Sequence, residues 1–353
     1  MNKKKLLSMF ATAALIVSCL APASSANAAT GDPTAISYVD AMYKNANAAA
    51  SVGMKYDASL TYGAAAGQTD TMKVSGDFSS IIASQEYALT ANMDLGLMGA
   101  AMAMPKATMQ TYNIKNPNGG YDLYEFDGKT WEKEHVSDSD MESMSNAVTS
   151  DPMALLSNLA VASTSQAISG KDCVVVSGEL TGETIANIQK ASDQESYKSY
   201  SKMIAGDKKR LQKLTKKQKK LTKKLKKANS KKKKKKLKKS IKATKSQIKM
   251  YKKSIKFQKK QLDTMKKEDE NGYAVLAQCS PVKYTFSIDK ATNNPVKTDV
   301  DMTSFLKSYL PSLDSEFKAY AESLQSCSIS VTYTINEVTA INLPPEAQNA
   351  KSR

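Results

Sequence analysis

The feature that most constrains this chain is a lysine-rich block that begins at Lys198 and ends at Lys267. The block holds 32 Lys and Arg residues against only two acidic residues, Asp207 and Asp263. The rest of the chain has 19 basic and 32 acidic residues, so the overall formal charge of +17 describes neither part. We therefore expect two parts that differ in structure and in the partners they attract.

Apolar residues inside the block recur at spacings of three and four, as in the seam of a coiled coil. Folding the chain back near Lys231 matches two such series and places Gln218 opposite Thr244 in one polar layer. The match predicts an antiparallel helical hairpin over 197–270, with arms of about 30 residues and roughly 45 Å. The other predicted pairs are Leu225 with Leu237, Leu221 with Ile241, Leu214 with Ile248, Leu211 with Tyr251, Ile204 with Gln258, Tyr200 with Leu262, and Tyr197 with Met265.

The outer faces of this hairpin would be almost entirely lysine, without the Glu partners that stabilise ordinary helices. Self-repulsion should make it marginal at low salt. Lysine binds phosphate without reading a sequence, which favours teichoic acid, anionic lipid headgroups or unspecific nucleic acid as partners; a merely solvated face is the alternative. The candidate polyanion-binding residues are Lys216, Lys220, Lys224, Lys227, Lys231, Lys232, Lys233, Lys234, Lys235, Lys236, Lys238 and Lys239.

The N-terminal residues 1–28 have the layout of an export signal. Lysines precede an apolar run over 6–20, and small residues end at Ala28, a plausible cleavage point. A lipobox cut before Cys19, with a lipid anchor on that residue, is the alternative. No other stretch approaches the ~20 apolar residues that span a bilayer. We expect an extracytoplasmic protein without a transmembrane segment, either secreted or held at the cell surface.

The remaining residues, 29–196 and 271–353, suit one domain interrupted by the basic insertion. A helix is predicted from Pro33 to about Ser51, and others over 138–149, 152–161 and 304–326, the last interrupted near Pro311. Asp127 and Gly128 form a hairpin signal between 121–126 and 130–134. Further alternating strands are predicted over 52–62, 72–78, 87–97, 109–114, 171–180, 282–288, 296–302 and 327–335.

Long strands with one apolar side indicate an antiparallel sheet with one buried face. The predicted fold class is therefore α+β, a curved antiparallel sheet or half-barrel covered by helices and interrupted by the long helical hairpin. A methionine-rich stretch over 95–105 should form either the top of the core or a soft lining for an apolar ligand. The candidate ligand-cavity residues are Tyr56, Leu60, Leu89, Met93, Leu97, Tyr284, Phe286 and Val331.

Three segments carry a resemblance to a known family: LYEFDGKTWEKE at 123–134, VKYTFSIDKATNNPVKTDVDM at 282–302, and SVTYT at 330–334 followed by Leu343-Pro344-Pro345. With the order of elements, they resemble the LolA/LppX-like secreted proteins and lipoproteins of Gram-positive bacteria over most of 34–190 and 272–347. The resemblance implies a half-barrel that cradles lipid or another apolar molecule against its helices. The basic insertion is not part of that family pattern.

The sequence lacks the residues of common catalytic sites. His135 is the single histidine, on a predicted strand, and no nucleophile elbow, zinc motif or phosphate loop occurs. Cys173, Cys279 and Cys327 allow at most one disulfide and are better read as small apolar side chains. No catalytic residue, metal or cofactor is predicted, and an enzyme is the weakest class.

Two hypotheses follow. The first is a non-enzymatic extracytoplasmic binding protein, with an apolar or lipid ligand in the half-barrel and a basic hairpin that contacts envelope polyanions. The second is a structural or protein-interaction module, with a packed core and the coiled coil as a spacer or docking arm. An open apolar cavity enclosed by this domain and lined by residues such as Leu89, Met93 and Tyr284 favours the first hypothesis, and a filled core contradicts the carrier.

Overall fold

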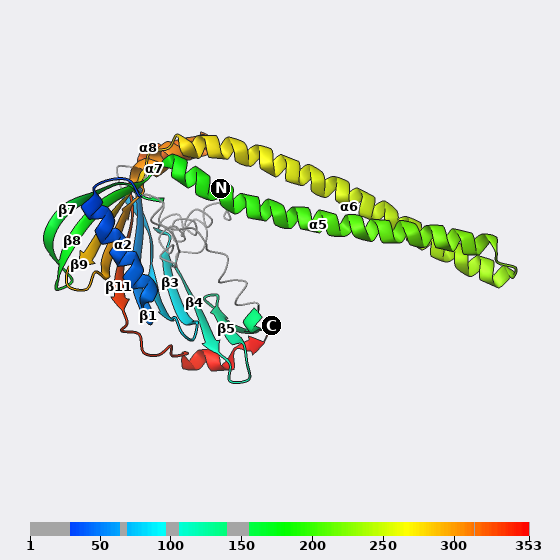
Figure 1. Cartoon of the computed structure of the whole chain (residues 1–353), viewed down its shortest axis with the longest axis horizontal. Coiled ribbons are helices and arrows are strands. Elements are labelled where there is room, and N and C mark those ends of the chain that lie inside the picture. Colours follow the sequence, from blue (N-terminus) through cyan, green and yellow to red (C-terminus); the bar gives the residue numbers. More distant parts are fainter. Residues whose placement is uncertain (1–28, 64–68, 97–105, 140–154, 314, 353) are drawn as a thin grey trace. The chain divides into compact units, whose positions relative to one another are not determined.

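The computed structural model describes residues 29–63, 69–96, 106–139, 155–313 and 315–352. It forms two compact units, one running to Gly182 and resuming at Cys279, the other Glu183–Gln278. The first unit is built on a curved, almost wholly antiparallel sheet, and the second is a helical hairpin (Figure 1). The predicted α+β class is confirmed.

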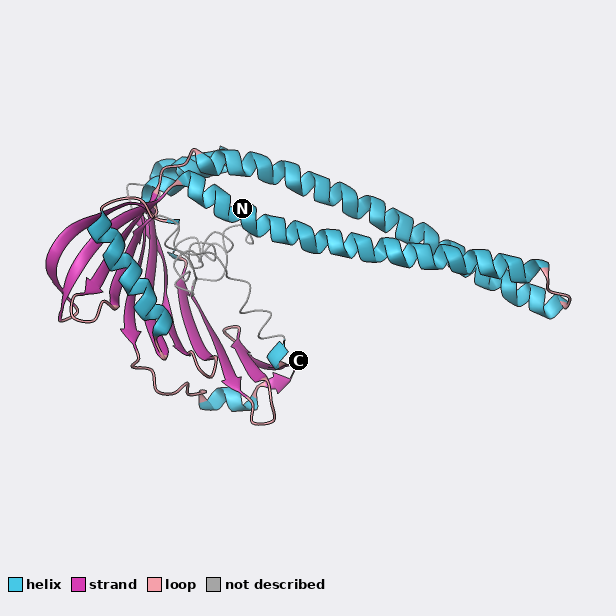
Figure 2. Ribbon diagram, viewed as in Figure 1, coloured by secondary structure: helices cyan, strands magenta, loops and turns pink. Residues whose placement is uncertain are grey.

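Within the described residues the sheet has 12 strands, in the order β12-β6-β5-β4-β3-β2-β1-β11-β10-β9-β8-β7. Every neighbouring pair is antiparallel except β12 and β6. Figure 2 shows how strongly these strands curve as a set. The strands are β1 (Ser51–Gly63), β2 (Thr69–Ile81), β3 (Glu86–Asp94), β4 (Lys106–Lys115), β5 (Tyr121–Phe126), β6 (Trp131–Val136), β7 (Ser157–Ile168), β8 (Lys171–Leu180), β9 (Val282–Asp289), β10 (Pro295–Asp301), β11 (Leu324–Ile335) and β12 (Lys351–Ser352).

The predicted hairpin at Asp127 is confirmed, with a longer turn than the Asp-Gly pair alone suggests. Phe126 pairs with Trp131, so four residues connect β5 and β6. The Asp127 carboxylate accepts hydrogen bonds from the backbone N–H groups of Lys129, at 2.9 Å, and Thr130, at 2.8 Å. These hydrogen bonds hold the pKa of Asp127 below its usual value. The aspartate therefore fixes the turn by capping backbone donors.

Of the helix predicted over 152–161, residues 152–154 lie outside the described residues, and the prediction is wrong from Ser157, where strand β7 begins. Ser157 pairs with Glu179 and Val161 with Val176, so β7 is an edge strand against β8. Leu156 and Leu159 are buried, and their spacing of three mimicked a helical face. Pairing with β8, the next strand along the chain, overrode the local pattern. Of the other helix predicted here, Asp138 and Ser139 are helical and 140–154 lie outside the described residues.

Short helices and 3₁₀ turns accompany the sheet. Helix α2 (Pro33–Ala48) begins at the N-cap Asp32, whose carboxylate accepts from Thr34 N at 2.8 Å, and contacts β7, β8 and β9. Helices α7 (Thr303–Tyr309) and α8 (Ser315–Ser323) are separated by a 3₁₀ turn, η3 (Leu310–Ser312), so the predicted interruption at Pro311 is confirmed. A second 3₁₀ turn, η4 (Pro345–Asn349), contacts β6.

The helical hairpin consists of α5 (Gly182–Lys226) and α6 (Lys231–Ala277). Both helices extend beyond the 197–270 range of the heptad pattern. The Ser230 hydroxyl caps α6 by accepting from Lys233 N at 3.2 Å. In the sequence the hairpin lies between β8 and β9, which are neighbours in the sheet. It is therefore an insertion at the connection between two adjacent strands.

The heptad pattern correctly predicts most of the seam within the hairpin. Ile204, Ile255 and Leu262 form a buried cluster against which Tyr197, Tyr200 and Leu211 pack. The Tyr200 hydroxyl donates to Gln261 Oε1 at 2.9 Å, which agrees to one residue with the predicted pairing of Tyr200 and Leu262. The placement of Met265 in the seam is wrong, because that side chain is exposed and Tyr197 bonds Asp269 instead. A polar network thus replaces the last predicted apolar layer.

Candidate binding surfaces

The predicted apolar ligand residues share one face of the sheet. Tyr56 pairs with Val331, which pairs with Thr298, which in turn pairs with Phe286. Direct cross-strand partners project to the same side. The cross-strand pairs of the adjacent residues place all seven described candidates on this side of the sheet, which we call the apolar face. They are Tyr56, Leu60, Leu89, Met93, Tyr284, Phe286 and Val331. Leu97, the eighth candidate, lies outside the described residues.

Burial divides the apolar face into two parts. On β9 and β11 the face is packed, with Tyr284 7%, Phe286 2% and Val331 2% exposed. The rings of Tyr284 and Phe286 stack with their centroids 5.9 Å apart. The buried residues of α2, which contacts β7–β9, add to this core. These three candidates are therefore buried in the packed part of the face, and sequence alternation alone does not distinguish such positions from open ones.

On β1 to β4 the same face is only partly covered. Tyr56, Leu60, Leu89 and Met93 are half-buried. Met109, which pairs with Ala91 on this face, is 44% exposed. Phe78 pairs with Leu89 on this face, and its ring stacks on that of Tyr87 with the centroids 6.2 Å apart. We call the set Tyr56, Leu60, Phe78, Leu89, Met93 and Met109 the open apolar surface.

Gly76, within the open apolar surface, leaves room for the side chain of Tyr56. Tyr56 lies across Gly76, and its hydroxyl donates to the Thr90 carbonyl oxygen at 2.8 Å. A Cβ atom on Gly76 would lie 1.8 Å from that oxygen and 2.6 Å from the Tyr56 hydroxyl. Burial, together with the nearby Asp77 carboxylate, raises the pKa of Tyr56 to about 12. Sequence reasoning missed Gly76, although a glycine inside a strand is a known sign of close approach.

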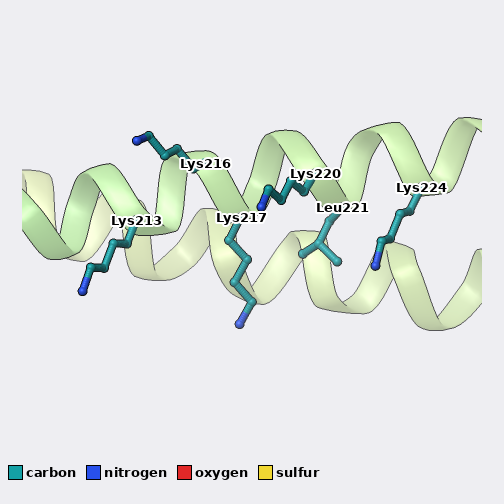
Figure 3. Close-up of a pocket in the computed structure, with 6 residues that line it drawn as sticks. All are labelled: Lys213, Lys216, Lys217, Lys220, Leu221 and Lys224. Atoms are coloured by element: carbon teal, nitrogen blue, oxygen red, sulfur yellow. The ribbon is translucent and has the colours of Figure 1, made fainter.

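All twelve predicted polyanion-binding lysines are exposed, and they occupy the end of α5, the start of α6 and the turn region between. A shallow depression of about 440 Å³ on α5 gathers three of them with two further lysines around an apolar side chain (Figure 3). Its lining residues are Lys213, Lys216, Lys217, Lys220, Leu221 and Lys224.

A second depression, of about 380 Å³, lies on α6 and contains none of the predicted lysines. Its lining residues are Lys245, Ile248, Lys249, Lys252, Lys253 and Lys256. Sequence reasoning selected the densest lysine run and overlooked these positions. The detectable signal was their spacing of three and four residues, which keeps them beside one apolar seam residue on one side of the helix.

The charge of the hairpin is uncompensated over most of its length. No Asp or Glu occurs between Asp207 and Asp263, and residues 200–262 hold 29 basic side chains against Asp207 alone. At 1.5 Å per residue this gives about one net positive charge per ~1.7 Å of hairpin, comparable to the negative charge density of duplex DNA. At the start of this stretch Arg210 Nη1 lies 3.7 Å from Asp207 Oδ1.

Acidic residues lie instead near the start of α5 and the end of α6, where they form a hydrogen-bond network with two tyrosines. The Tyr197 hydroxyl donates to the Asp269 carboxylate, and the Tyr273 hydroxyl donates to Asp193 Oδ2 at 2.8 Å. Burial, followed by the bond to Asp269, raises the pKa of Tyr197. Gln258 Nε2 donates to Asp207 at 3.2 Å. Hydrogen bonds thus tie α5 to α6 where the charge is lowest.

The single histidine and the three described cysteines form no common site. His135 is exposed on β6, with Nδ1 3.2 Å from Asp122. Cys173, Cys279 and Cys327 are free and buried, and no disulfide joins the described residues. No group of three or more potential metal-binding side chains occurs in the described part of the chain. No helix in that part is both long and apolar enough to cross a bilayer.

Comparisons with known proteins add little. No family model matches the chain, and no curated protein matches it. Among solved structures it is similar to a DUF1329 family protein from Desulfovibrio piger ATCC 29098, with 6% identity, 86% of this chain and 92% of that chain covered, and a TM-score of 0.21. At this TM-score the likeness carries no conclusion about function.

Proposed function

We propose that this protein is a non-enzymatic, extracytoplasmic binding protein that holds an apolar or lipid molecule against its sheet. The open apolar surface is the observation that carries the proposal. Aromatic, leucine and methionine side chains remain partly exposed there, while on β9 and β11 the same face is packed. Apolar surface of this kind gains free energy when a ligand removes it from water, and methionine adapts to irregular ligands.

The second part of the proposal concerns the lysine hairpin, which would contact an envelope polyanion. The uncompensated charge over 200–262 supports this role, because polyanion binding releases the counterions that such a charge density collects. An export signal at 1–28, or a lipid anchor at Cys19, would bring the hairpin to teichoic acid and anionic lipid headgroups. The LolA/LppX-like resemblance supports the same function.

The ligand part of the proposal can be tested with two adjacent substitutions on β3. Met93→Lys places a charge on the open apolar surface, where desolvation should weaken binding of an apolar fluorescent fatty-acid probe about tenfold or more. Asn92→Lys adds the same charge on the opposite, exposed face and should leave the affinity unchanged. Equal affinity of both variants and the wild type would contradict a ligand site on this surface.

The second candidate function is an interaction module without a small-molecule ligand. The packing of Tyr284, Phe286 and Val331 favours it, because on β9 and β11 the apolar face is covered by the protein itself. Native mass spectrometry of protein purified from an envelope fraction separates the two functions. A bound lipid supports the carrier, whereas ligand-free protein that also fails to bind the probe supports the module.

A further inference from the structure

Two apolar side chains on α6 are exposed in the middle of the lysine-rich region. Met250 is 59% exposed and Phe257 is 62% exposed. They are seven residues apart, so they project from nearly the same side of the helix. Ile255 and Leu262, which face α5 in the buried cluster, lie about 140° to 160° away from Phe257 around the helix axis. The exposed pair therefore points away from the seam.

Lysines flank this pair on the same side of α6. Lys253 lies three residues after Met250 and four before Phe257, and Lys260 lies three residues after Phe257, so both exposed lysines share this side of the helix. No carboxylate occurs anywhere between Asp207 and Asp263. A partner surface must therefore offer dense negative charge and, at the same depth, an apolar region for Met250 and Phe257.

We propose that this side of α6 inserts Phe257 and Met250 into an anionic phospholipid bilayer while the flanking lysines contact lipid phosphates. This inference rests on the proposed function that the hairpin binds an envelope polyanion, and it names the polyanion. The binding mode is that of an interfacial basic helix with long apolar side chains. Lysine side chains can bend toward the headgroups and let the ring sink below them.

The alternatives fit these residues less well. A phosphodiester polymer satisfies the lysines but gives Phe257 and Met250 no apolar environment. A second copy of the hairpin offers apolar contact but meets the same uncompensated positive charge, which would repel it. An anionic bilayer supplies both chemistries in one surface.

The test uses the full-length protein and vesicles with about 30 mol% phosphatidylglycerol in phosphatidylcholine. The double variant Met250→Ser/Phe257→Ser keeps every lysine and should bind these vesicles about 10- to 100-fold more weakly than the wild type, because it lacks the inserted side chains. Its helix content should be unchanged, since both positions are exposed. The matched control is Gln212→Ser/Gln247→Ser, at two exposed positions of the hairpin, with wild-type affinity expected.

Binding to a phosphodiester polymer distinguishes a failure of membrane insertion from a failure of polyanion binding. The double variant should bind duplex DNA, a purely electrostatic ligand, as tightly as the wild type. Equal vesicle binding by variant and wild type would overturn insertion while leaving polyanion binding intact. If the wild type binds neither vesicles nor DNA at low salt, the proposed role of the hairpin itself fails.

Insertion depth gives an independent readout. Phe257→Trp places a tryptophan at the site, and the chain has one other, Trp131. The difference spectrum from the unsubstituted protein should show a blue shift with anionic vesicles and quenching by bromine-labelled acyl chains. An unshifted, unquenched signal from vesicle-bound protein would overturn the inference.

Discussion

Leu180 and Val282 are cross-strand partners at the adjoining ends of β8 and β9, although the whole helical hairpin lies between them in the sequence. The sheet is therefore continuous across the insertion, and the chain leaves and re-enters it at neighbouring positions. Strands β8 and β9 could therefore pair in the same register without the hairpin between them. This relationship also explains how a basic region can be present without interrupting the alternation of the flanking strands.

Deleting residues 183–278 should leave the sheet folded. Joining Gly182 to Cys279 gives a connection of five residues between Leu180 and Val282, a normal length for a β-hairpin. We expect a cooperative thermal transition and a β-type circular dichroism spectrum. Because a shorter connection costs less closure entropy, the melting temperature should not fall. Loss of the cooperative transition would show that the sheet depends on the hairpin.

Gly76→Ala should destabilise the sheet by about 1–3 kcal/mol, because the added methyl group collides with the Thr90 carbonyl and displaces Tyr56. Urea unfolding followed by tyrosine fluorescence measures the change. Gly63→Ala on β1 is the matched control, since its Cβ atom would meet Ser323 O at an ordinary 3.7 Å. Equal stability of the two variants would refute a special role for Gly76.

Asp122 should contribute a pH-dependent part of the stability. Burial would raise its pKa, but hydrogen bonds from Lys133, Asn116 and His135 outweigh burial and hold the pKa below its usual value. A lowered pKa in the folded state stabilises the protein above the unfolded value of about 3.9, and this stabilisation is lost as the pH falls through the folded value.

Asp122→Asn should therefore lower the urea midpoint near neutral pH and flatten its decline below about pH 4. The Lys133 ammonium, 2.7 Å from the carboxylate in the wild type, loses its charged partner in this variant. Asp57→Asn, at an exposed position of β1, is the control substitution. An unchanged slope in the acid range would rule out Asp122 as a source of the pH dependence.

The hairpin should be more stable at higher salt, the reverse of a helix held by surface ion pairs. Raising NaCl from about 20 mM to about 300 mM shortens the range of the lysine repulsion, and the helical signal at 222 nm should persist to higher temperature. Ile255→Ala should lower that transition at every salt concentration, because it opens the buried cluster. A melting curve independent of salt would contradict the repulsion argument.

Gly206→Ala should stabilise the hairpin by about 0.5–1 kcal/mol without making any new contact, since Ala favours the helix and an added Cβ atom meets nothing within 4 Å. The shift should be visible in the same helical transition. A decrease in stability would show that Gly206 serves a bend or a close contact in solution.

Much of the architecture follows from local periodicity. The alternation along 52–62 and 282–288 predicts strands with one apolar face, and the heptads predict a helical hairpin and its register near Tyr200. These features are readable because side-chain direction along one element repeats every 2 or about 3.6 residues. The cap at Asp32 and the turn at Asp127 are equally local, since each depends on side chains beside their own backbone.

Only the tertiary structure decided which elements meet. Leu156 and Leu159 have the spacing of a helical face, yet residues 157–161 belong to β7 because β8 offers backbone partners. Phe286 and Met93 follow the same alternation, but the first is buried in the packed core and the second is only partly buried. The sequence by itself determined the face on which each side chain lies. What covers that face, and so whether it forms core or binding surface, depends on contacts between residues far apart in the chain.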